Sequence, residues 1–247
     1  RHNNSLILFD RFKMENANFV VFAKSGAGKS YTIKLEILRS LMVGTEVLVI
    51  DPENEYQHLA EAVGGSFINI SLNSQSRINP FDLPRGLEGE SQEDIMRSAV
   101  IFLLGLMNLM LGQLDPTEEA IMDKAIWQTY AKKDITVQSD LSNVEFPTMG
   151  DLVEVLQGMV GAENLSQRLS KYTQGTFSGI FDQQSNVGLI NSLVVFSIRD
   201  LEDILRPIAM FVLVNHIWNL VRSELKRRIL VLDEAWALID NPIFAPK

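Results

Sequence analysis

Short apolar runs alternate with helix-like segments along the first 70 residues of the chain. The apolar runs cover residues 19–22, 46–50 and 66–70, and the segments between them, residues 29–43 and 56–63, have apolar positions at helical spacing. This order predicts a βαβαβ unit whose strands are parallel, joined by right-handed crossovers and buried on both faces. Ligands of such sheets bind beyond the carboxyl ends of the strands.

Between residues 90 and 175 the strand signals disappear and apolar positions recur at helical spacing. This change predicts an inserted helical subdomain. The expected helices cover residues 92–111, 117–133, 149–159 and 162–172. The most apolar stretch, residues 99–111, is shorter than the ~18 residues typical of a membrane span and is interpreted as a buried helix.

After residue 175 the α/β pattern returns. We expect a strand at residues 193–198, a long helix at residues 204–221 and a very apolar strand at residues 229–232. His216, in this long helix, is interpreted as a packing residue rather than a ligand.

A glycine-rich loop, Ala-Lys-Ser-Gly-Ala-Gly-Lys-Ser at residues 23–30, joins the first apolar run to the first expected helix. Such a loop can direct several backbone N–H groups at one point, where the helix N-terminus adds partial positive charge. Gly26 and Gly28 let the backbone curl around phosphates, Lys29 can reach the β and γ phosphates, and the Ser30 hydroxyl can bind Mg²⁺. Ala23 replaces the first glycine of the usual pattern. The loop predicts a nucleotide-binding protein.

The residues expected to contact the phosphates are Ser25, Gly26, Ala27, Gly28, Lys29, Ser30 and Tyr31.

Two adjacent carboxylates, Asp233 and Glu234, directly follow the last apolar run. A phosphate-binding ATPase needs such groups opposite its loop: Asp233 for the Mg²⁺ shell, and Glu234 to polarise the attacking water as a general base. A solvated acidic turn after a strand would give the same pattern. Because the two carboxylates occur in one chain with the glycine-rich loop, the catalytic interpretation is favoured.

A further acidic cluster follows the second apolar run. Asp51 precedes Pro52, which suits a turn or the first turn of a helix, so Asp51 and Glu53 are candidates for capping and for loading a helix N-terminus. The other interpretation is a supporting role near Mg²⁺ or the attacking water, because strand ends converge on one crevice in this fold. The sequence leaves both open.

Composition narrows the classes of function. The chain of 247 residues has no cysteine and three histidines, which excludes disulfides and thiolate metal sites and argues against zinc. Its net charge of −9 does not imply nucleic acid, although a pore can concentrate a few basic residues. Arg1 is not a natural start, so we expect the chain to begin inside a longer protein or at an artificial boundary.

Several motifs in this order resemble the large assembly ATPases of type IV secretion and conjugation systems, of the VirB-four or TraC kind. The resemblance covers about residues 18–239. It is carried by Gly26-Ala27-Gly28-Lys29-Ser30, Lys34-Leu35-Glu36, Ile50-Asp51-Pro52-Glu53-Asn54-Glu55-Tyr56, Gly64-Gly65, Ile78-Asn79-Pro80-Phe81 and Leu232-Asp233-Glu234-Ala235-Trp236.

The resemblance implies an α/β, RecA-like P-loop NTPase with a mostly parallel sheet and an inserted helical subdomain. Residues 1–89 and 176–247 would form the two parts of the ATPase domain, and residues 90–175 the insertion. It also implies ATP and Mg²⁺ as ligands, with Lys29 and Glu234 catalytic and Ser30 and Asp233 at the metal.

The family acts at the cytoplasmic face of a membrane-spanning secretion machine, in pilus biogenesis and substrate transfer. The implied partners are therefore other secretion components at the inner membrane and further copies of the chain, a hexamer being one arrangement. Related ATPases continue past the Asp-Glu strand to a further strand that ends in a polar sensor. Because this chain stops at Lys247, we expect the second part to be incomplete and the sheet to lack a central strand.

Two other functions stay open. One is a DNA-translocating ATPase of the coupling-protein or HerA type, which would show salt-dependent DNA affinity. The other is a nucleotide-binding assembly scaffold that orders an interface without turnover.

Overall fold

A parallel sheet of four strands organises the computed structural model, which describes residues 10–84, 90–139, 141, 144–222, 224 and 226–235. The strands run in the order β2-β3-β1-β4 across the sheet. Their bounds are β1 (Glu46–Asp51), β2 (Ser66–Asn69), β3 (Leu193–Ser197) and β4 (Arg228–Leu232). All pairings are parallel, so the carboxyl ends of the four strands lie at one edge of the sheet.

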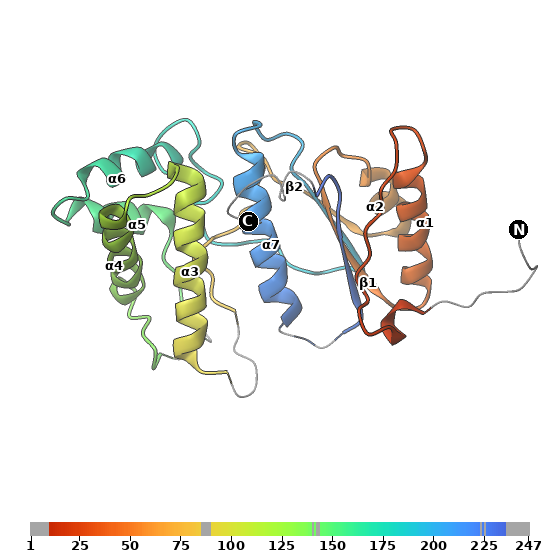
Figure 1. The fold of residues 1–247 in the computed structure, drawn as a ribbon, viewed down its shortest axis with the longest axis horizontal. Helices are drawn as coiled ribbons and strands as arrows, with labels where there is room; N and C mark the ends of the chain where they lie inside the picture. The colour runs from red at the N-terminus through yellow and green to blue at the C-terminus, as the bar shows by residue number, and fades with distance from the viewer. Residues whose placement is uncertain are drawn as a thin grey trace, which may run out of the picture.

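The central strand β1 decides what lies on each face. Val47 and Val49 point to one face, where they pack with residues of α1 (Lys29–Met42) and α2 (Gln57–Val63). Leu48 and Ile50 alternate with them and join the larger core on the other face, on the side of α7 (Arg206–Arg222). Figure 1 shows this layering, with α1 and α2 on one side of the sheet and α7 on the other.

Beyond α7 lies a group of helices that the chain forms between β2 and β3 (Figure 1). We call these helices the helical group. They are α3 (Gln92–Leu111), α4 (Pro116–Lys132), α5 (Met149–Gln157), α6 (Glu163–Leu169) and the 3-10 turn η2 (Ser170–Tyr172). Ser91 caps α3, and Asp115 caps α4 in a capping box with Glu118. The boundaries at residues 89/90 and 175/176 stay predictions.

The helix α3 is long and apolar enough to cross a membrane, by length and composition, and within the described part of the chain no other helix passes that test. Its inner face, including Leu103, Leu106 and Met107, is fully buried in the larger core. On the side that faces α7 (Figure 1), Phe102 stacks on Phe211 of that helix at 4.9 Å between ring centroids. One face of α3 therefore packs in the core, while Ile101 on the same helix is 66% exposed.

The first predicted strand is absent. Residues 19–22 lie in extended chain without strand pairing, after the short 3-10 helix η1 (Arg11–Lys13). Phe19, Val20 and Phe22 are 50%, 75% and 92% exposed. Among the described residues β4 pairs only with β1, and a cavity separates residues 19–22 from β4. An apolar run forms a strand only where a partner edge is within reach, so the prediction is wrong here.

Candidate functional site

The glycine-rich loop has the backbone shape that its glycines predict. Gly26 and Gly28 have φ angles of 75° and 90°, in the left-handed region that residues with a Cβ rarely adopt. No neighbouring atom lies near a Cβ built at either position, so the backbone conformation, not crowding, requires glycine there. The loop tightens through a hydrogen bond from the Ala27 N–H to the Lys24 carbonyl, 3.0 Å.

Directly after the loop, α1 begins at Lys29 with Gly28 at its N-cap. Glycine offers no side chain to cap the helix, and the first N–H groups of α1 face the loop without a capping hydrogen bond. Ser25 and Ala27 are exposed, Ser30 is half-buried, and Tyr31 turns a 73% exposed side chain to solvent. The predicted phosphate-binding residues therefore surround one helix N-terminus that is open to an anion.

Lys29 connects this loop to the carboxyl end of β4. Its ammonium group lies 2.7 Å from Asp233 Oδ1 and 2.7 Å from Glu234 Oε1. These two hydrogen bonds raise the pKa of Lys29 well above its usual range, so the side chain stays charged. The structure brings together three of the predicted functional groups across more than 200 residues of sequence.

The two carboxylates occupy different environments. Asp233 is 7% exposed, and its N–H donates to the Ile50 carbonyl, which extends the pairing of β4 with β1. Glu234 is more accessible and has a φ of 51°, a left-handed conformation that is unusual for a residue other than glycine. This turn directs both side chains toward Lys29. Trp236, which ends the last motif, lies outside the described residues.

Asp51 lies beside this site, but its carboxylate accepts hydrogen bonds from the backbone of the following turn. It is fully buried and accepts three N–H donors, from Glu53 at 3.2 Å, Glu55 at 3.1 Å and Tyr56 at 2.8 Å. Burial raises the pKa of Asp51, and the three N–H donors oppose that rise. Asp51 thus closes the turn after β1, whereas Glu53 is exposed at its surface. Because α2 begins only at Gln57, with Tyr56 at its N-cap and no acidic residue in its first turn, Asp51 caps no helix and Glu53 does not load one. The capping interpretation is therefore wrong, and Asp51 instead closes the turn that precedes the helix.

Tyr56, at the end of the same motif, is a site residue that the sequence reasoning missed. Its side chain is 1% exposed, and it lines the same cavity as Lys29 and Asp233. Burial, together with the charge of Asp233, raises the pKa of Tyr56 well above its usual range, so the hydroxyl keeps its proton. The only sequence signal was its place at the end of the acidic motif.

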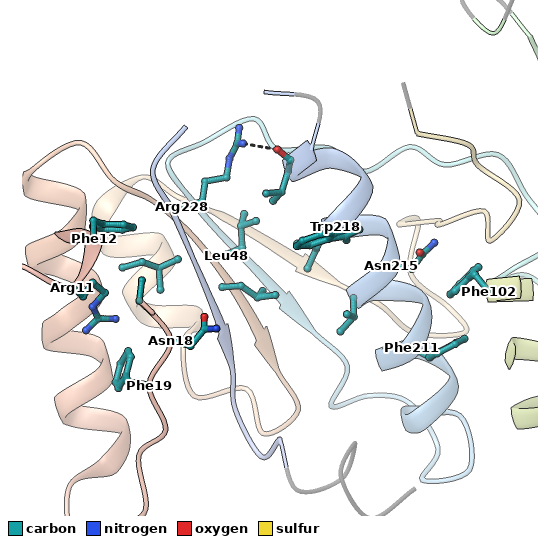
Figure 2. Close-up of a pocket in the computed structure, with 16 residues that line it drawn as sticks. Arg11, Phe12, Asn18, Phe19, Leu48, Phe102, Phe211, Asn215, Trp218 and Arg228 are labelled. Atoms are coloured by element: carbon teal, nitrogen blue, oxygen red, sulfur yellow. Dashed lines mark hydrogen bonds between the residues drawn. The ribbon is translucent and has the colours of Figure 1, made fainter. Parts of the chain in front are cut away.

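Two neighbouring cavities follow β4 along the edge that does not pair with β1. One, of about 540 Å³, reaches from residues 19–23 to Lys29, Tyr56, Asp233 and Glu234. The other, of about 620 Å³, lies at the amino end of the strand, and Figure 2 shows Phe12 and Phe19 on one side of it and Trp218 of α7 on the other. The nucleotide loop therefore opens onto a largely apolar groove.

The donor set at the carboxyl end of β4 fits Mg²⁺. Magnesium takes hard oxygen ligands and is usually held by one or two protein oxygens together with substrate phosphates and water. The Ser30 hydroxyl, next to Lys29 at the start of α1, and the Asp233 carboxylate, which contacts Lys29, are such oxygens. Among the described residues no three His, Cys, Asp or Glu side chains gather as a metal site of their own.

A parallel sheet with helices on both faces, a glycine-rich loop leading into a helix and an acidic strand end opposite it define the class: an α/β, RecA-like P-loop NTPase fold, which binds nucleotides. The family model of the TraG P-loop domain matches residues 7–246. The chain belongs to this family.

Two relatives support the resemblance to the VirB-four and TraC kind of ATPase, which is confirmed. The chain is 27% identical to Protein TraC of Escherichia coli (strain K12) over 248 residues, 95% of this chain and 27% of that protein. It also matches the structure of VirB4 of Thermoanaerobacter pseudethanolicus with a TM-score of 0.87 at 29% identity, over 97% of this chain and 67% of that one. The chain thus spans about a quarter of its curated relative.

Proposed function

We propose that this chain is the ATPase part of a type IV secretion or conjugation system, and that it hydrolyses Mg-ATP to energise pilus biogenesis and substrate transport. The observation that carries the proposal is the contact of Lys29 with Asp233 and Glu234, 2.7 Å to each. One ammonium group beside the phosphate loop meets both carboxylates, so the groups that phosphoryl transfer needs share one site. Similarity to TraC and VirB4 supports the assignment to secretion.

Each residue has a distinct role in this proposal. The loop N–H groups and Lys29 bind the β and γ phosphates and offset their negative charge. Ser30 and Asp233 would hold Mg²⁺, which would supply positive charge to neutralise the phosphates. Glu234 accepts a proton from water as the water oxygen bonds to the γ phosphorus and the bond to the leaving ADP breaks.

The proposal extends to the surroundings of the site. We infer that the chain works as a homo-oligomer at the inner face of the cell membrane, in contact with other secretion components, as its relatives' family implies. The apolar groove beside β4 and the exposed loop support contact with further protein at this edge.

DNA translocation is less well supported. The basic cluster at the start of β4 is largely neutralised: Lys226 and Arg228 both pair with Glu46, at 3.2 and 2.7 Å, and with Glu224. Arg227 lies over the ring of Phe12. Phosphate contacts need accessible cations, and this cluster offers few.

Two variants test the proposal. Lys29→Ala removes the phosphate contact and should weaken nucleotide binding as well as turnover, whereas Glu234→Gln keeps the shape of the side chain and should retain binding while turnover falls roughly 10²–10⁴-fold. The measurements are phosphate release and binding of a fluorescent ATP analogue by the purified protein. Phosphate release that is unchanged in both variants would contradict the site, and nucleotide-dependent assembly of the wild type without release would support the scaffold function instead.

A further inference from the structure

Tyr31, the third residue of α1, is an exposed aromatic residue beside the nucleotide loop. Its side chain is 73% exposed, whereas Tyr56, Tyr130 and Tyr172 are all buried, at 1% exposure or less. A single exposed apolar group is ordinary on a protein surface. The position of this ring relative to a bound nucleotide therefore decides what the ring can do.

The backbone of Tyr31 belongs to the site that receives the phosphates. The first hydrogen bond of α1 runs from the Thr32 N–H to the Gly28 carbonyl, 3.0 Å. The N–H groups of Lys29, Ser30 and Tyr31 precede that bond, so they can donate to phosphate oxygens. The Tyr31 side chain thus starts from the rim of the anion site.

The helix places Tyr31 on the side opposite to Lys29. Successive residues of an α-helix are about 100° apart, so Tyr31 points about 200° around the axis from Lys29. Lys29 shares its side with Ile33 and Ile37, which pack on the sheet. Tyr31 shares its side with Met42, which is 85% exposed, and Figure 1 shows α1 at the outside of the molecule. The ring therefore lies on the solvent side of the helix N-terminus.

The two sides of this helix N-terminus correspond to the two ends of a bound nucleotide. Lys29, Asp233 and Glu234 mark the side where the γ phosphate reacts in the proposed function. A triphosphate that begins there crosses the helix N-terminus along the N–H groups. Its ribose and base then emerge on the other side, where Tyr31 lies.

We infer that the Tyr31 ring stacks on the base of the bound nucleotide. This inference rests on the proposed function, in which the γ phosphate lies on the Lys29 side. An aromatic side chain can stack on any base, because every base has a π face, and the larger face of a purine offers more contact. The contact favours purine over pyrimidine nucleotides, and it acts on affinity because it lies away from the reacting phosphate.

The experiment measures by calorimetry how tightly ATP, CTP and inorganic tripolyphosphate bind in the presence of Mg²⁺. Tripolyphosphate presents the phosphates without a base. Tyr31→Ala should weaken ATP binding roughly tenfold, as loss of one base–aromatic stack does, and should leave tripolyphosphate at its wild-type affinity. It should also reduce the preference for ATP over CTP. Tyr31→Phe keeps the ring and should bind ATP like the wild type.

Met42→Ala is the matched control for Tyr31→Ala. It removes another exposed side chain from the same side of α1, at the end of the helix remote from the loop. All three ligands should bind this variant as they bind the wild type. Because both side chains are exposed, both variants should keep the wild-type melting temperature.

Equal losses of affinity for ATP and tripolyphosphate in Tyr31→Ala would overturn the inference, because the ring would then act on the phosphates or on the loop. Unchanged ATP binding in Tyr31→Ala would overturn it as well. If the wild type binds ATP without releasing phosphate, hydrolysis is refuted while the comparison of ligands still decides the role of Tyr31. If the wild type binds no nucleotide, both proposals fall.

Discussion

In the helical group the apolar face of each helix meets another apolar face, whereas along β4 the apolar side chains meet a groove. Leu106 of α3 and Leu152 of α5 are fully buried, but Leu230 in β4 is 40% exposed and Phe22 across the groove is 92% exposed. The helical group also buries polar side chains together with their partners: the Tyr130 hydroxyl donates a hydrogen bond to the Phe81 carbonyl.

This difference in burial separates the part of the protein that contributes most to folding stability from the part that carries the proposed functional residues. The proposed nucleotide site lies at the end of the less enclosed strand, beside exposed loop residues, while the helical group surrounds no comparable set of functional side chains in the described residues. Binding loops are commonly drawn from the less stable parts of a fold because they must move. Three substitutions, in order of decreasing effect, test this division.

The largest loss should follow a cavity in the helical group. Leu106→Ala removes a fully buried side chain from α3, and we expect it to lower the free energy of unfolding by about 3 kcal/mol. Chemical denaturation measures this change. Ile101→Ala, on the same helix but at a 66% exposed position, is the control and should cost under about 1 kcal/mol. Equal losses at both positions would break the comparison.

A smaller effect should come from Asp82, which lies where the helical group meets the loop after β2. Burial raises its pKa to about 6, and a hydrogen bond from the Ser185 hydroxyl opposes that rise. The folded protein then holds this proton at a pH where the unfolded chain has lost it, so Asp82 lowers stability as the pH rises from about 4 to about 6.

Asp82→Asn removes this penalty. The variant should be more stable than the wild type by up to about 2 kcal/mol above pH 6.5, and the advantage should vanish near pH 4, where the wild-type carboxyl is protonated. Denaturation across that pH range checks the sign. A constant difference at every pH would show that this part of the protein is not the dry region that the packing indicates.

The smallest effect belongs to the open edge. Leu230→Ala removes a side chain that is already 40% exposed between the two cavities, so we expect a loss below about 1 kcal/mol, clearly less than for Leu106→Ala. The same denaturation assay measures it. A loss as large as that of Leu106→Ala would mean that the groove is filled in solution by a contact that packs on this residue.

The sequence predicted the helical group well because its signals are local. The helix at residues 92–111 has its observed bounds, since Ser91 and the acidic residues after it mark the start and Gly112 follows the end. The strand at residues 19–22 failed for the opposite reason. Its apolar pattern is that of a strand, but strand formation depends on a partner edge, which no local pattern specifies.

The site divides in the same way. The approach of Lys29 to Asp233 was predictable because the glycine-rich loop and the two carboxylates after an apolar run are both recognisable parts of one phosphate site. The position of Tyr56 in the same cavity as Asp233 was not, since it brings together residues that follow different strands and depends on the register of β1 with β4. The left-handed backbone of Glu234 likewise has no signal in its residue type.

The two glycines after α2, Gly64 and Gly65, show that a sequence motif can reflect a close approach of the backbone as well as functional chemistry. Gly64 ends the helix with a φ of 71°, a conformation that asparagine also tolerates. Gly65 differs, because a Cβ there would lie 2.8 Å from the Leu193 carbonyl oxygen of β3, closer than atoms can approach. A single methyl group at residue 65 would thus force the neighbouring strands β2 and β3 apart. It would do so at the amino ends of the strands, opposite to the proposed nucleotide site.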